Sequence, residues 1–224
     1  GVAVKSAALF DAVTGASITF TVTESDTSKS GTTALTPITT VNPAIVDHIA
    51  FTTQPSSTVA AGLDLAVQPV VTIRDEFENI RLADTTSIEL FAVLASDTSV
   101  LGGGLLNAGG NPLNALAGVA SFSGVNYTLA EDIKLKASMT GVADIFSNTI
   151  AVIPAAIDHF TVEPAAAVQT AGAPFDVTIT AYDNLDNVIT DYDVRAGGHM
   201  FTFTTTALDA PDGTPPFLSP LTDA

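Results

Sequence analysis

The sequence predicts an all-β protein, and three observations point to this class. Hydrophobic residues make up 46% of the 224 residues and charged residues only 14%, which supplies a packed core and excludes a disordered chain. The apolar residues are mostly Val, Ile, Ala, Leu and Phe mixed with abundant Thr, a composition that suits half-buried strands. Gly, Pro, Asn and Asp interrupt these runs, and no helical periodicity of useful length competes with them.

Six β-rich runs follow one another in the central part of the chain, at residues 48–53, 67–75, 86–94, 117–123, 131–139 and 145–153. Short strands at intervals of roughly 8–12 residues or somewhat more, separated by turn residues, are typical of an antiparallel sandwich. The glycine-rich stretches 102–104 and 109–110 are interpreted as flexible hairpin connections, because no Gly-Lys-Ser/Thr of a phosphate-binding loop follows them.

Comparison of the chain with itself indicates an internal repeat of about 110 residues, the usual size of one sandwich domain. The block VNPAIVDHI at 41–49 matches VIPAAIDHF at 152–160. The block VTIRDEFENI at 71–80 matches ITAYDNLDNV at 179–188. Matching blocks in the same order predict that residues 46–156 form one complete repeat.

A third block sets the phase of the repeat. The motif Gly-Val-Ala at 118–120 lies deep inside the complete repeat and recurs at 1–3. We therefore expect residues 1–45 to be the C-terminal part of a split repeat and 157–224 the N-terminal part. We expect a 1–45 segment of the next unit to complete the 157–224 part. Three arrangements fit: a covalent tandem array, separate subunits joined by strand exchange, and a permuted monomer whose own ends meet. The extended assemblies, covalent or not, are favoured over the permuted monomer.

The charge of the chain excludes several classes of partner. The formal net charge is −17, with seven Lys and Arg residues scattered along the sequence. No basic patch exists to neutralise phosphates, so we expect no nucleic-acid binding.

No apolar run approaches about 18 residues, so no membrane insertion is expected. The chain has no cysteine, which suits a secreted protein that depends on packed cores rather than disulfides.

The repeated blocks resemble a known family. DHIAF at 47–51, VVTIRD at 70–75 and GVASF at 118–122, with AGAPFDV at 171–177 in the second repeat, are similar to the immunoglobulin-like repeats of large bacterial and archaeal surface proteins. The resemblance covers nearly the whole chain and implies immunoglobulin-like antiparallel β-sandwiches in tandem. Where that family usually has glycine before the turn asparagine, this chain has Glu78 and Asp186.

The resemblance also implies a role. Repeats of that family act as stalks, spacers, adhesin shafts and filament or surface-layer components, so we expect an extracellular, non-enzymatic structural unit that assembles head-to-tail with copies of itself. The alternative is an adhesin or ligand-binding accessory module with a glycan or protein ligand. The lack of Trp and the presence of only three Tyr weaken a carbohydrate site, which normally offers exposed aromatic rings. A glycan array that found a specific ligand would reverse this order.

The acidic turns are the candidate metal-ligating residues. DNLDN at 183–187 gathers oxygen ligands as calcium loops do, although it lacks the glycine and the distal glutamate of an EF-hand. Asp and Asn also favour ordinary turns, because their side chains bond to their own backbone. We interpret the segment as a hairpin turn and retain a weak calcium site at Asp183, Asp186 and Asn187 as the alternative. No other cofactor is expected.

The remaining polar motifs are interpreted as structural. His48 and His159 each follow an aspartate in matching blocks, without a Ser or Cys nucleophile motif, so repeat architecture explains them better than catalysis. Three dispersed histidines do not form a zinc signature. Asn126-Tyr127-Thr128 is a glycosylation sequon, which makes Asn126 a candidate modification site. No catalytic residue is predicted.

Overall fold

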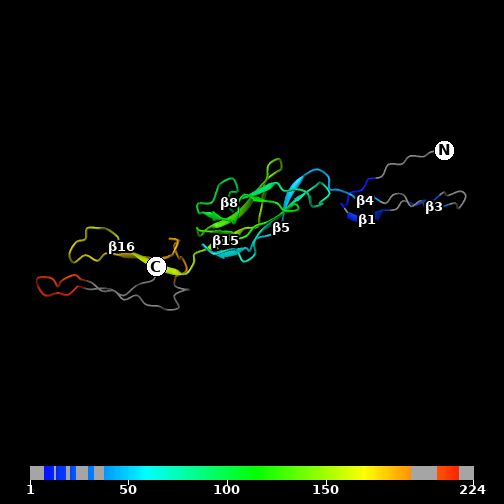
Figure 1. Cartoon of the computed structure of the whole chain (residues 1–224). Helices are drawn as coiled ribbons and strands as arrows, with labels where there is room; N and C mark the ends of the chain where they lie inside the picture. Colours follow the sequence, from blue (N-terminus) through cyan, green and yellow to red (C-terminus); the bar gives the residue numbers. More distant parts are fainter. Residues whose placement is uncertain are drawn as a thin grey trace. The chain divides into compact units, whose positions relative to one another are not determined.

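The chain is described by a computed structural model over residues 8–12, 14–18, 21–23, 30–32, 38–192 and 206–216 (Figure 1). All regular elements in these ranges are β-strands, which confirms the all-β class predicted from the sequence. The chain divides into two compact units, Gly1–Val188 and Ile189–Ala224. Among the described residues no helix is long and apolar enough to cross a membrane.

Two sheets organise the central residues 46–156. Three antiparallel strands form one sheet in the order β11 (Val119–Ser121), β7 (Val70–Arg74) and β5 (His48–Thr53). The second sheet has the order β10 (Leu113–Asn114), β8 (Ser87–Leu94), β13 (Asp132–Ser138), β15 (Ile150–Ile153) and β6 (Thr58–Ala60), with β14 (Ile145–Phe146) also on β13. All of these pairs are antiparallel except β15 with β6.

Four smaller pairs complete the described strands. Within the central residues, β9 (Leu106–Asn107) pairs with β12 (Asn126–Tyr127). Before them, β1 (Thr14–Ile18) pairs with β4 (Ile38–Thr40), and β2 (Thr21–Thr23) pairs with β3 (Ser30–Thr32). After them, β16 (Ile157–Pro164) pairs with β17 (Val177–Asp183) over seven residue pairs.

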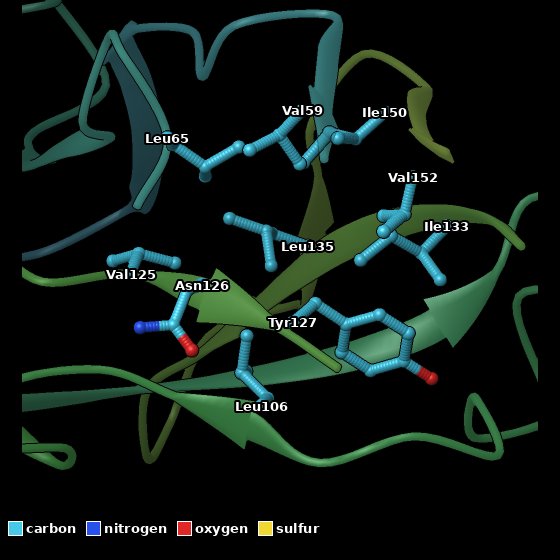
Figure 2. A pocket seen from close by; sticks show the side chains of 10 residues that line it. All are labelled: Val59, Leu65, Leu106, Val125, Asn126, Tyr127, Ile133, Leu135, Ile150 and Val152. Carbon is cyan, nitrogen blue, oxygen red and sulfur yellow. The ribbon is translucent and has the colours of Figure 1, made fainter. Parts of the chain in front are cut away.

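One hydrophobic core joins the two central sheets, an arrangement compatible with a β-sandwich. Its fully buried side chains come from both sheets: Ile49, Val71, Ile73, Ile88, Leu90, Ala120, Ile133, Leu135, Ala137 and Ile150. Burial alternates along β13, because successive side chains point to opposite faces of a sheet. Figure 2 shows side chains converging around a cavity of about 10 Å³, which is too small for a ligand and marginal for one water molecule.

Most predicted strands coincide with observed ones. The runs at 48–53, 86–94 and 131–139 correspond to β5, β8 and β13 within one residue at each end. The run at 145–153 is wrong as a single strand. Ser147 divides it into β14 and β15, because its backbone N–H and hydroxyl are bonded to Leu135 across the sheet. The Gly-Val-Ala block at 1–3 and residues 193–205 lie outside the described residues.

Candidate functional site

Two loops of matching sequence form the most distinctive polar structures of the chain. The first comprises residues 75–79 and directly follows β7, and the second comprises residues 183–187, at the end of β17. We call them the Asp–Asn loops, because each begins with a buried aspartate and ends with an asparagine. Isolated bridges, Arg74 with Ile80 and Tyr182 with Val188, close both loops at the base.

Each aspartate organises its own loop. Asp75 Oδ1 accepts hydrogen bonds from the N–H groups of Phe77 and Asn79 at 3.0 and 2.9 Å. Asp183 Oδ1 accepts the equivalent bonds from Leu185 and Asn187, both at 2.9 Å. These are the local side-chain-to-backbone bonds that make Asp a turn residue. The turn predicted from the sequence is therefore present at both places.

The second carboxylate oxygen reaches outside the loop. Asp75 Oδ2 accepts from the N–H of Ala44 at 2.8 Å, and Asp183 Oδ2 accepts from the N–H of Ala155 at the same distance. Ala44 and Ala155 both follow a proline in the matching blocks that precede β5 and β16. Each aspartate thus fixes the segment through which the chain enters the sheet that carries the loop.

The asparagines reach further, to strand-free segments that come much earlier in the chain. Asn79 Nδ2 donates to the carbonyl of Phe10 at 2.8 Å, and its Oδ1 accepts from the N–H of Ala12 at 3.0 Å. Asn187 Nδ2 donates to the carbonyl of Thr128 at 3.0 Å, and its Oδ1 accepts from Ala130 at 2.8 Å. One asparagine amide therefore satisfies a carbonyl and an N–H two residues apart, in the same way at both places.

An apolar side chain in the middle of each loop contacts a segment outside the loop. The ring of Phe77 lies against that of Phe10, with the centroids 4.8 Å apart. The equivalent Leu185 approaches Gly62 so closely that a β-carbon there would meet Leu185 Cδ1 at 2.8 Å. A hollow of about 400 Å³ opens beside this contact, between residues 60–63, 154–156 and 184–185.

The carboxylates are held ionised by their donors. Burial alone would raise the pKa of Asp75, but hydrogen bonds from the Asn79 side chain and three backbone N–H groups outweigh it and lower the pKa to about 2. The pKa of Asp183 is also lowered: burial opposes the shift, whereas the donors on Ala155 and Asn187 favour it. Both loops therefore carry a buried negative charge at neutral pH that their hydrogen bonds compensate.

This pKa shift predicts acid sensitivity. A group whose pKa is lower in the folded protein stabilises it fully above the unfolded value of 3.8 and loses that contribution as the pH falls towards about 2. We expect chemical denaturation midpoints to be constant from pH 7 to 5 and to fall below pH 4. Asp75→Asn should show a smaller fall over the same acid range. Equal acid losses in the two proteins would contradict the assignment.

Residues 78 and 186 occupy left-handed backbone conformations, with φ angles of 68° and 63°. Glycine adopts this region without cost, whereas other residues pay roughly 1–2 kcal/mol. The turn thus keeps the geometry that suits glycine although Glu78 and Asp186 stand there. Asn79 and Asn187 are thereby aimed outwards from the loop, and the strain is offset by their hydrogen bonds.

Replacement of Glu78 tests the strain. Glu78→Gly also removes the ion pair of Glu78 Oε2 with Arg74, 2.9 Å long, so Glu78→Gln serves as the matched control that lacks this charge only. We expect Glu78→Gly to be more stable than Glu78→Gln by about 0.5–1 kcal/mol in chemical denaturation. A Gly variant equal to or weaker than the Gln variant would show that the backbone at residue 78 is unstrained.

The two predicted histidines lie beside the loops in equivalent positions. His48 Nδ1 lies 2.9 Å from Asp47 Oδ2, and its Nε2 lies 3.4 Å from Glu78 Oε1. His159 has the corresponding neighbours Asp158 and Asp186, at 3.1 and 3.6 Å. Both imidazoles are partly exposed, and each lies between two carboxylates.

No protein-family model and no curated protein matches the sequence. The site is therefore interpreted from its own geometry.

The calcium alternative stays a prediction. The oxygens of Asp183 and Asn187 that it would use accept hydrogen bonds from protein N–H groups, and Asp186 is exposed. Within the described residues no three carboxylate or imidazole groups gather as a metal site. We expect thermal midpoints in calcium and in chelator to agree within about 1 °C, because a ligand that does not bind the native state does not shift unfolding. A clear rise in calcium would establish the site.

The candidate glycosylation residue is engaged with its neighbours. Asn126 Nδ2 donates to Asp64 Oδ1 at 2.8 Å, and its Oδ1 accepts from Asn107 Nδ2 at 2.8 Å. The glycine-rich stretch 102–104 lies nearby and is anchored: Gly103 N–H donates to Glu131 at 2.8 Å, and Gly104 N–H to the Tyr127 hydroxyl at 2.6 Å. Tyr127 in turn donates to Glu131. These hydrogen bonds hold the glycine-rich stretch against Tyr127 and Glu131, which indicates a structural role.

Sequence reasoning missed the partners of the loops. Asp183 and Asn187 were singled out as ligands, but Ala44, Ala155 and the carbonyls at positions 10 and 128 were not. The available signal was the recurrence of Pro-Ala ahead of each loop, with Ala44 31 residues before Asp75 and Ala155 28 residues before Asp183. Backbone groups carry no side-chain signature, so only this recurrence could have indicated them.

Proposed function

We propose that this chain is a non-enzymatic building block of an extracellular filament, stalk or surface layer, built from immunoglobulin-like sandwich repeats in tandem. One observation carries the proposal: the two Asp–Asn loops make the same hydrogen bonds to the same kinds of preceding segment. A set of hydrogen bonds that recurs at a spacing of about 110 residues fixes one repeat against the next.

The energetics of the loops suit that task. Each loop joins three segments through a buried carboxylate and an amide, and bonds to an ionised group contribute roughly 1.5–3 kcal/mol each. Bending between successive repeats would break bonds of Asn79 and Asn187 and expose the apolar contacts beside them. The chemistry of the site thus resists rotation between repeats. A net charge of −17 keeps such an assembly soluble through self-repulsion.

Within this proposal residues 46–156 are the complete repeat, and a 1–45 segment completes the 157–224 part in a neighbouring copy. Head-to-tail contacts of this kind continue into open fibres unless the rotation closes a ring. The role is mechanical, with copies of the same chain as partners.

Self-association of the 224 residues tests the proposal. Size-exclusion chromatography with light scattering should give a mass that rises with protein concentration, and negative-stain images of the early fractions should show unbranched fibres. Chains carrying both Asn79→Ala and Asn187→Ala should form fibres with larger bending angles. A folded monomer at every concentration would defeat the filament and leave the permuted monomer.

A further inference from the structure

The glycosylation sequon at residues 126–128 is bonded on both edges of its strand. On one edge β12 pairs with β9, which places Tyr127 opposite Leu106. On the other edge the carbonyl of Tyr127 accepts a hydrogen bond from the N–H of Gly62 at 2.8 Å. An enzyme that binds the sequon as a free extended segment would have to displace both neighbours.

The two side chains that define the sequon are also engaged. Asn126 Nδ2 donates to Asp64 Oδ1 at 2.8 Å and lies 3.5 Å from the carbonyl oxygen of Gly124, so both amide hydrogens have an acceptor. Thr128 Oγ1 accepts a hydrogen bond from the N–H of Leu105 at 2.8 Å. A transferase must bind this amide and this hydroxyl, because together they distinguish a sequon from any other asparagine. Both groups are held by protein partners in the folded chain.

The middle residue of the sequon belongs to the hydrophobic core. Tyr127 is 2% exposed, and its ring lies with Ile133 and Leu135 around the small internal cavity (Figure 2). Its hydroxyl accepts from the N–H of Gly104 and donates to Glu131. To free the sequon, the chain must withdraw this ring from the core and break the bonds on both edges of β12. Such an opening approaches unfolding of the whole central repeat.

We propose that Asn126 accepts a glycan only on the unfolded chain, so that modification has to precede closure of the central repeat. The donor class is a lipid-linked oligosaccharide diphosphate. Its anomeric carbon forms a bond to Asn126 Nδ2, and the bond from that carbon to the diphosphate oxygen breaks. The amide loses one proton, and the lipid diphosphate leaves. The rate of folding therefore sets the time available for transfer, whether or not the chain assembles with copies of itself.

Transfer by a purified enzyme tests the proposal. A single-subunit oligosaccharyltransferase and its lipid-linked donor are added to the folded full chain, and mass spectrometry follows the modification of Asn126. A synthetic peptide of residues 121–133 carries the same sequon without the fold. We expect the peptide to be modified faster by about a hundredfold or more, because the unfolded fraction of a native protein is roughly 10⁻³–10⁻⁶. Similar rates for peptide and folded chain, or no transfer to the peptide, would overturn the proposal.

The matched control places an accessible sequon in the same folded chain. Asp97→Asn creates an Asn-Thr-Ser sequence at 97–99, where residues 97 and 99 are exposed in a turn outside the strands. The chain has a single natural sequon, so Asn126→Gln in the same variant leaves the new one alone. We expect this double variant to be modified while folded, at a rate near that of the peptide. Folded chain modified at Asn126 as fast as at position 97 would contradict the proposal.

A destabilised variant gives a second measurement. Gly118→Ala leaves the sequon unchanged, but its β-carbon would lie 2.6 Å from the carbonyl oxygen of Arg81, so the unfolded fraction should rise. Transfer to Asn126 should rise with it, by about a hundredfold. Gly124→Ala lies closer to the sequon but meets nothing within 4 Å, and should raise the rate only about fivefold. Equal rises in the two variants, or none in Gly118→Ala, would show that the enzyme reaches Asn126 without unfolding.

Discussion

Gly118→Ala is expected to destabilise the chain by about 3 kcal/mol. Gly118 has a φ of +73°, which costs a residue with a side chain about 1–2 kcal/mol. A β-carbon there would also lie 2.6 Å from the carbonyl oxygen of Arg81, a backbone atom that cannot rotate away. Chemical denaturation followed by circular dichroism measures the loss.

Gly124→Ala is the matched control for Gly118→Ala. Gly124 has a similar φ of +62°, but nothing lies within 4 Å of a β-carbon built there. Its replacement should cost only about 1 kcal/mol, the conformational part alone. The difference between the two variants isolates the close approach of the backbone at Arg81. Equal losses would show that this approach does not constrain residue 118.

Asn187→Ala is expected to cost about 2–4 kcal/mol and to uncouple the second Asp–Asn loop from residues 128–130. Asn187 is 3% exposed, and its amide bonds to Thr128, Ala130 and both oxygens of Asp183. Truncation leaves a partly buried carbonyl, a partly buried N–H and part of a charged carboxylate without their partner, and each such loss carries a desolvation penalty.

The control for Asn187→Ala is Asn184→Ala in the same loop, where the side chain is exposed. Replacement of an exposed residue without such bonds should change stability by less than about 0.5 kcal/mol. Hydrogen exchange should also show faster exchange of the Ala130 N–H in Asn187→Ala alone. Variants that unfold together and exchange alike at Ala130 would remove Asn187 from the coupling.

Much of the strand content could be predicted from the sequence, because period-2 alternation is a local property. The runs at 86–94 and 131–139 alternate clearly, and β8 and β13 bury alternate residues as that pattern requires. The parallel pairing of β6 with β15 could not be predicted. Its residues, from Thr58 and Ala151 onwards, are far apart in the sequence, and nothing local specifies such a pair.

The glycines show the same division. Gly118 stood out in the sequence because its Gly-Val-Ala motif recurs, yet the repetition did not say why a glycine is needed. The structure supplies the reason, since Asp84 and Ile73 bond to its two backbone groups while Arg81 passes too close for a side chain. Conversely, Glu78 occupies a left-handed backbone position of the kind that glycine adopts most readily.

The acidic loops could be predicted as turns from the sequence, but their hydrogen-bond partners could not. The sequence by itself determined that Asp75 and Asn79, like Asp183 and Asn187, form a turn, because Asp Oδ1 bonds to N–H groups two and four residues ahead. It could not decide between a cation and a protein partner for the remaining oxygens, because both require the same acceptors. The tertiary structure decided which protein donors these oxygens accept, because it brings the N–H groups of Ala44 and Ala12, from 31 and 67 residues away, to Asp75 Oδ2 and Asn79 Oδ1. A buried carboxylate takes whichever donors the fold places beside it, and those donors are set by packing rather than by local sequence.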